Sequence, residues 1–260
     1  MTTSLLKNSF RTITLLAMLF SLTFAAQAQT TDSVFAKGNQ SYMQGKYQQA
    51  VGEYLRILKQ GKVSSDLCYN LGNSYFKINQ NALAILYYEK ALKLNPAHAD
   101  ARFNLRQANS KTVDKIAPLP EIFFKRWWKN WVTLCSIDTW AQLSLVALFL
   151  LVASLVLFIR SATAVSKVVF FVFIILFVLS FAFSFTSGWY GHYKFKNETF
   201  AIVTSPSTYV KSSPDVQGKD LFILHEGAKG KITEQIGDWY RLHIADGNEG
   251  WVKKEAIERI

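Results

Sequence analysis

Residues 38–54 recur 34 positions later in the chain, as residues 72–88. The positions that match are Gly38 and Gly72, Asn39 and Asn73, Ala50 and Ala84, and Tyr54 and Tyr88. A period of this length is typical of a helix–turn–helix unit, which cannot bury its apolar face alone and therefore stacks on its neighbours. The sequence predicts a stack of at least two helical pairs, and such stacks usually present a groove to another protein.

The second copy shows the features of the unit most fully. Its first helix is predicted over residues 68–75 and its second over residues 84–92. Gly72 and Ala84 would let these helices approach closely, and Pro96 would end the second one because proline lacks a backbone N–H donor. A capping helix is expected from residue 100 onward. The pattern resembles the tetratricopeptide repeat, so we assign residues 29–117 to a tetratricopeptide α-solenoid.

One face of this solenoid is predicted to form a groove that binds a partner protein. Its residues are Phe35, Asn39, Tyr42, Tyr69, Asn73, Phe76 and Lys77. Tyr69, Asn73 and Lys77 are spaced four apart, so a ring, an amide and a cation would meet on one helix face. Such a groove suits an extended or helical segment of a partner.

A clamp for the C-terminal carboxylate of a partner fits the same domain less well. Asn39 and Asn70 stand at the two asparagine positions of such clamps. The positions that need lysine or arginine are occupied by Phe35, Asp100 and Asn104. Recognition of an internal polypeptide segment is therefore the better interpretation.

The start of the chain has the features of a secretory signal peptide over residues 1–28. Lys7 and Arg11 precede an apolar run at residues 13–25, and Ala26 and Ala28 supply the small residues of a cleavage site. The mature chain would begin at Gln29, outside the cytoplasm. A retained signal anchor is the alternative, although the run is short for a membrane span.

Two long apolar runs, at residues 139–159 and 168–190, are predicted to be transmembrane helices. Roughly 20 residues at about 1.5 Å each cross a hydrocarbon core of about 30 Å. Residues 160–167 join the two runs, so we expect an antiparallel hairpin with a cytoplasmic loop. Both flanking domains would then lie on one side of the cytoplasmic membrane, and the export signal makes that side the periplasm.

The distribution of basic residues favours the opposite orientation. The loop carries Arg160 and Lys167, whereas the flanks carry five basic residues within 125–129 and 194–196, and such residues favour the cytoplasmic side. We give the export signal precedence because it acts first during synthesis. Within residues 118–138 the cations also lie among two phenylalanines and three tryptophans. This composition suits an interfacial membrane helix better than a platform for nucleobases or sugars.

Residues 198–260 consist of short alternating runs separated by turn residues. Strands are predicted at residues 200–203, 208–211, 221–224, 230–234, 239–244 and 250–252. Gly237-Asp238 and Asp246-Gly247 would allow tight hairpins. The segment resembles a bacterial SH3 domain, a small β-barrel, through residues 225–228 and 237–252. Trp239 and Trp251 would either face a ligand on this barrel or pack within its core and hairpins.

Nothing in the sequence indicates catalysis, so we expect no enzyme activity, no cofactor and no metal. The histidines at positions 98, 192, 225 and 243 lack the spacing of a metal site, and no phosphate-binding loop or nucleophile elbow occurs. The net charge is +11, but much of the excess lies beside the apolar runs. Nucleic acid is therefore not an expected partner.

The order of these segments over the whole chain resembles one family, BatE of the Bat aerotolerance proteins of Bacteroidota. The resemblance implies a non-enzymatic envelope protein that works beside von Willebrand factor A-domain Bat membrane proteins and a MoxR-type ATPase. The leading hypothesis is a membrane-anchored scaffold that assembles a protein complex in the periplasm. The alternative is an envelope sensor whose barrel binds peptidoglycan while its repeats report to a partner.

Overall fold

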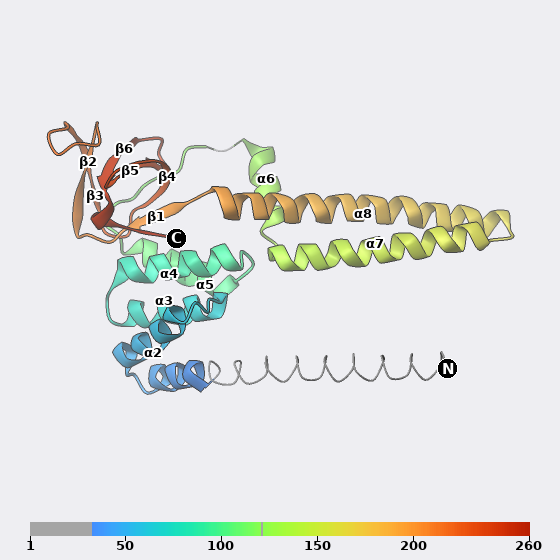
Figure 1. Cartoon of the computed structure of the whole chain (residues 1–260), viewed down its shortest axis with the longest axis horizontal. Coiled ribbons are helices and arrows are strands. Elements are labelled where there is room, and N and C mark those ends of the chain that lie inside the picture. The colour runs from blue at the N-terminus through green and yellow to red at the C-terminus, as the bar shows by residue number, and fades with distance from the viewer. Residues whose placement is uncertain (1–32, 121) are drawn as a thin grey trace, which may run out of the picture.

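The computed structural model describes residues 33–120 and 122–260. The predicted signal peptide, residues 1–28, lies outside the described residues. The described chain has a stack of helices, a long hairpin of two apolar helices and a C-terminal antiparallel sheet (Figure 1). The described chain thus has separate α and β parts, as the sequence predicts.

The stack contains a helix at residues 33–43 followed by α2 (Tyr47–Lys59), α3 (Ser65–Lys77), α4 (Asn81–Leu94) and α5 (Ala99–Ser110). Their facing sides form one apolar core in which Tyr54, Leu71 and Tyr88 are almost fully buried. Ser64 caps the N-terminus of helix α3, because its side chain accepts a hydrogen bond from the Leu67 N–H. Two helical pairs and the capping helix α5 therefore form where the 34-residue period predicts them.

The hairpin is built from α7 (Ile137–Arg160) and α8 (Ala164–Asn197), and α6 (Phe123–Val132) packs beside its base. The Trp140 indole donates a hydrogen bond to the Val132 carbonyl at 3.0 Å, which ties α7 to α6. Both α7 and α8 are long and apolar enough to cross a membrane. Only 17% of the most apolar stretch of α7 and 6% of that of α8 is buried, whereas a core helix of a soluble domain would be mostly covered.

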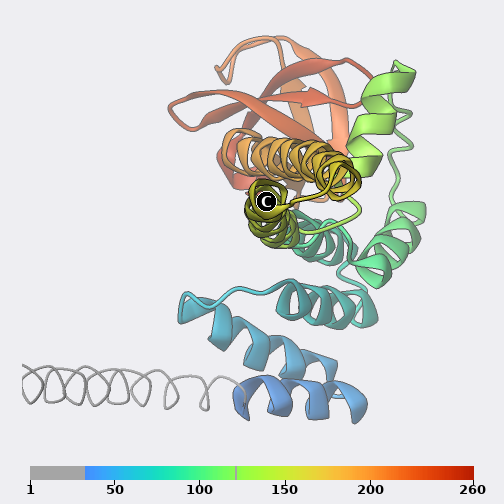
Figure 2. The same ribbon diagram turned by 90° about the vertical axis from the view of Figure 1, so that its right-hand side faces the viewer.

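Both hairpin helices extend beyond the apolar runs seen in the sequence, so the turn between them is three residues, 161–163, rather than the eight of the predicted loop. Helix α8 continues past the predicted end of its span, residue 190, to Asn197, because hydropathy marks the membrane core and not the end of a helix. Glu198 and Thr199 alone separate α8 from the sheet. Figure 2 looks along the hairpin, with the sheet on one side and the helical stack on the other.

The sheet contains β1 (Phe200–Val203), β2 (Ser207–Lys211), β3 (Asp220–His225), β4 (Lys229–Ile236), β5 (Trp239–Ile244), β6 (Glu249–Lys253) and β7 (Ile257–Arg259). The spatial order is β3-β2-β6-β5-β4-β1-β7, and all pairs are antiparallel. The turns after β4 and β5 use Gly237 and Gly247 at φ values of 54° and 94°, which glycine adopts without strain. Strands β3 and β7 form the two edges, so the sheet is open and the closed barrel is not confirmed.

The helical stack and the sheet are packed against each other. Ile202 of β1 belongs to the apolar core of the stack, and Glu89 of α4 forms an ion pair with Lys229 of β4 at 2.6 Å. Asp114 accepts a hydrogen bond from the backbone N–H of His225 at 2.7 Å, and its other oxygen lies 2.8 Å from the His225 Nδ1. The helical stack and the sheet are therefore held together at the same end of the hairpin (Figure 1).

Candidate partner-binding groove

A hollow of about 280 Å³ opens on the face formed by the first helix of each pair. We call it the Tyr69 groove, and its lining is Tyr42, Tyr69, Asn73, Phe76, Lys77, Tyr88, Asn104 and Gln107. Five of the seven residues singled out from the sequence lie together in it. Helices 33–43, α3, α4 and α5 all contribute, so the groove exists only when the repeats are stacked.

Each repeat contains the same internal hydrogen-bond triad. Asn39 Oδ1 accepts hydrogen bonds from the Tyr54 hydroxyl at 2.7 Å and from Asn70 Nδ2 at 3.0 Å. One period later, Asn73 Oδ1 accepts from the Tyr88 hydroxyl at 2.8 Å and from Asn104 Nδ2 at 2.8 Å. All three positions of the triad are therefore related by the 34-residue period.

The triads change the roles predicted for Asn39 and Asn73. The sequence treats both asparagines as groove residues that are available to a partner, but both side-chain oxygens are already occupied inside the stack. Only the NH₂ end of each amide can act on a ligand, as a donor. The triad also joins Asn39 to Asn70, the two asparagines that a carboxylate clamp would use, so this pair first serves repeat packing.

Phe35 and Asn39 do not line the Tyr69 groove. They occupy in the first repeat the positions that Tyr69 and Asn73 occupy in the second. The Phe35 ring packs on Tyr54, with ring centroids 5.9 Å apart. The predicted groove residues therefore follow the repeat over two units, and the hollow described above lies at the second unit.

The charged groups at the Tyr69 groove are lysines. Lys77 is exposed on its wall, and the Lys111 ammonium lies 4.1 Å from the centroid of the Phe76 ring, a favourable cation–π contact. Burial raises the pKa of Tyr42 and of Tyr88, and the neighbouring tyrosines raise both further. The phenols therefore stay neutral at ordinary pH, and the lysines give the groove a positive rim.

Three lining residues, Tyr88, Asn104 and Gln107, are absent from the sequence-based list. The repeat itself carried a signal for two of them, because Asn104 and Gln107 lie 34 residues after Asn70 and Asn73. Tyr88 belongs to the second helix of its pair, and its hydroxyl reaches the groove only through the triad. The period also marks Lys111, which caps α5 and lies 34 residues after Lys77.

In a comparison with known protein families, residues 65–98 match the tetratricopeptide repeat family. The matched segment covers α3, α4 and the link to α5, and so contains Tyr69, Asn73 and Lys77. No curated protein matches the chain. Stacked repeats of this kind bind other proteins on extended surfaces, which indicates protein–protein interaction for this part of the chain.

The two sheet tryptophans are not equivalent. Trp239 is half-buried beside an open hollow that is also lined by Val216, Asp238 and Lys253. Trp251 is only 7% exposed, because it lies on central strand β6 directly opposite Arg241 on one side and Lys211 on the other. Trp251 is therefore a packing residue, and the predicted ligand face is reduced to Trp239.

Metal-binding clusters and a reactive thiol are two chemical features to look for among the described residues. Within 33–120 and 122–260, no group of three or more His, Cys, Asp or Glu side chains is placed to hold a metal ion. Cys68 is buried in the tetratricopeptide stack, and this burial raises the pKa of its thiol to about 11, which keeps it in the unreactive protonated form.

Proposed function

We propose that this protein is a membrane-anchored scaffold that binds a partner polypeptide in the Tyr69 groove and helps to assemble an envelope protein complex. The observation that carries the proposal is the groove itself. It combines four aromatic rings, three amide side chains and a lysine rim, and its centre lies on a unit that matches the tetratricopeptide repeat. Aromatic and cationic side chains around a hollow are the groups that most often anchor a bound protein segment.

Membrane anchoring is supported by the exposed apolar surface of α7 and α8. Water would solvate this surface poorly, whereas about 30 Å of hydrocarbon matches the length of the apolar run on α7. Helix α6 presents Phe123, Phe124 and Trp127 to the outside beside Lys125 and Arg126, as an interfacial helix does. The chain would thus enter and leave the membrane on one side.

The periplasmic orientation and the partners rest on the sequence. The predicted export signal places both soluble parts outside the cytoplasm, in the cytoplasmic membrane of the envelope. The resemblance to BatE proposes von Willebrand factor A-domain Bat proteins and a MoxR-type ATPase system as partners, and a role in aerotolerance or stress. The open sheet would act as an SH3-like module fixed beside the groove.

A second candidate function is peptidoglycan binding by the sheet. The half-exposed Trp239 beside a polar hollow supports it, since an exposed ring next to polar groups can stack on a sugar. In that case the sheet would sense the cell wall and the repeats would carry the signal. This candidate depends on one half-buried tryptophan, whereas the scaffold depends on a groove with eight lining residues.

Site-specific photo-crosslinking in cells tests the scaffold. A photoreactive amino acid placed at Lys77 or Gln107 should capture the same partner, identified by mass spectrometry. The matched control is Lys59, an exposed lysine of α2 that does not line the groove. Equal capture from positions 59 and 77 would contradict the groove. Capture at Trp239 alone, with retention of the purified protein on peptidoglycan, would favour the sensor.

A further inference from the structure

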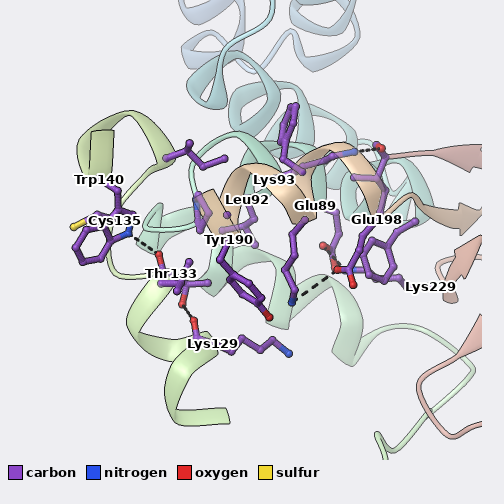
Figure 3. Close-up of a pocket in the computed structure, with 18 residues that line it drawn as sticks. Glu89, Leu92, Lys93, Lys129, Thr133, Cys135, Trp140, Tyr190, Glu198 and Lys229 are labelled. Carbon is purple, nitrogen blue, oxygen red and sulfur yellow. Dashed lines mark hydrogen bonds and ion pairs between the residues drawn. The ribbon is translucent and has the colours of Figure 1, made fainter. Parts of the chain in front are cut away.

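A second cavity, of about 230 Å³, lies where the helical stack, the hairpin and the sheet meet (Figure 3). We call it the Trp140 cavity. Its apolar wall includes Leu92 of α4, Val132 of α6, Trp140 of α7 and Phe195 of α8. The Tyr69 groove is on a different set of helix faces and shares no residue with it.

The Trp140 cavity has an excess of positive charge. Four lysines and two glutamates line it, at positions 93, 129, 194 and 229 and at positions 89 and 198. The glutamates are engaged by lysines of the sheet, since Glu89 pairs with Lys229 at 2.6 Å and Glu198 with Lys231 at 3.0 Å. Because the lining lysines outnumber the lining glutamates, an anion that entered the cavity would meet a net positive charge.

Lys93 of α4 and Lys194 of α8 are two of these lysines. The Lys93 ammonium donates to the main-chain oxygen of Ile260 at 2.8 Å and lies 5.3 Å from the Phe195 ring centroid. Lys194 lies 5.3 Å from the Tyr190 ring centroid and 3.8 Å from Glu198. Burial, together with the charges of Arg259 and Lys90, lowers the pKa of Lys93. A nearby anion would remove this electrostatic penalty.

The cavity is at the level where a membrane surface would be. A side-chain carbon at Gly191 of α8 would come within 3.2 Å of Ile137, the first residue of α7. The two helices are therefore level there, just before the apolar run of α7 begins at residue 139. Lys194 follows less than one turn after Gly191. Trp140 thus lies at the start of the apolar run of α7, and Lys194 lies on the other side of Gly191, at the depth of lipid phosphates.

We propose that the Trp140 cavity binds the phosphate-bearing headgroup of one anionic phospholipid, such as phosphatidylglycerol. The phosphate would contact Lys93 and Lys194, and the glycerol backbone with its first methylenes would lie against Leu92 and Trp140. The volume fits part of a lipid, because sites for whole drug-sized molecules are about 300–1,000 Å³. This inference rests on the membrane anchoring of the proposed function, and the lipid would join the hairpin to both soluble parts.

The test uses the full chain reconstituted in nanodiscs of phosphatidylcholine, with or without phosphatidylglycerol. Native mass spectrometry of the released protein measures which lipid is retained, and thermal unfolding of the soluble parts measures its effect. The wild type should retain phosphatidylglycerol in preference and unfold at a higher temperature when it is present. The variant Lys93→Gln with Lys194→Gln should retain roughly tenfold less. The control, Lys59→Gln with Lys219→Gln, removes the same charge from exposed positions and should behave as wild type.

A variant that fills the cavity, Leu92→Trp, provides an independent test, because it should exclude the lipid without changing the charge. Two results would overturn the lipid site while leaving the anchoring intact. In the first, the wild type retains both lipids equally. In the second, the wild type and the double lysine variant retain phosphatidylglycerol equally. A chain that fails to enter nanodiscs would contradict both. If inorganic phosphate in phosphatidylcholine nanodiscs raises the unfolding temperature as phosphatidylglycerol does, the ligand is a soluble anion and the lipid assignment is wrong.

Discussion

The Tyr88 ring lies over Gly72 so closely that a Cβ atom at position 72 would be 2.7 Å from the ring carbon Cδ1. The first repeat has the same relationship, with a Cβ at Gly38 only 2.5 Å from Cε1 of Tyr54. The glycine makes room for the ring, and the next residue, Asn39 or Asn73, accepts the hydroxyl hydrogen bond. The Gly-Asn pair of each repeat thus positions one buried tyrosine.

Gly72→Ala should therefore destabilise the repeat domain by about 1–3 kcal/mol, the usual cost of overpacking a core. Hydrogen exchange measured by mass spectrometry should show faster exchange in α3 and α4. The matched control is Gly52→Ala in α2, where a Cβ would meet nothing within 4 Å; it should stabilise by up to about 1 kcal/mol through helix propensity. Equal protection in the two variants would show that the Gly72–Tyr88 contact does not limit packing.

Alkaline pH should unfold the helical stack through its buried tyrosines. Burial raises the pKa of Tyr54 and of Tyr87 from 10.0 to about 12, and neighbouring ionisable groups add to the shift. The unfolded chain releases these protons near pH 10 and the folded chain only near pH 12. Stability should therefore be complete below pH 10 and fall between pH 10 and 12.

Circular dichroism of the helices and ultraviolet absorbance of tyrosinate should follow this transition together. The Tyr54→Phe variant loses one hydrogen bond, worth about 0.5–1.5 kcal/mol, but should depend less steeply on pH over the same window. Tyrosinate that forms near pH 10 without loss of helicity would contradict the burial of these phenols.

Gly227 should control the contact between the sheet and the helical stack. A Cβ at this position would lie 2.7 Å from Thr112 and 3.0 Å from Ile85, and its φ is +88°. Gly227→Ala should therefore loosen the interface and expose residues 111–117 to limited proteolysis. Gly237→Ala is the control, because its φ of +54° imposes backbone strain while nothing lies within 4 Å. Similar proteolysis of both variants would mean that strain alone, and not the interface contact, determines the effect.

The repeats and strands could be predicted because their signals are local. The 34-residue period locates both helical pairs, and alternation with turn glycines locates six of the seven strands. Strand β7 was missed because three residues, Ile257–Arg259, are too few to show a pattern. The closed barrel is predicted only from the resemblance to an SH3 domain. The local pattern does not give the strand order, because that order depends on pairings between distant residues.

The contacts that define the two cavities could not be predicted from local pattern. The asparagine–tyrosine triads join residues 15 and 31 positions apart, so they appear only once the helices are stacked. The sequence marked Asn73 as polar and near the groove, but not that its oxygen is already used. The Trp140 cavity combines residues from Glu89 to Ile260, and no segment alone indicates it.

The central claim is that α7 and α8 cross a membrane and leave both soluble parts on its periplasmic side. Single cysteines at Ser110, Gln217 and Ala162 test it, in a chain whose native Cys68 and Cys135 are replaced. In intact spheroplasts a membrane-impermeant thiol reagent should label positions 110 and 217, which belong to the helical stack and the sheet, and should not label position 162 in the hairpin turn. Labelling of position 162 alone would reverse the orientation, and labelling of all three would contradict the membrane hairpin.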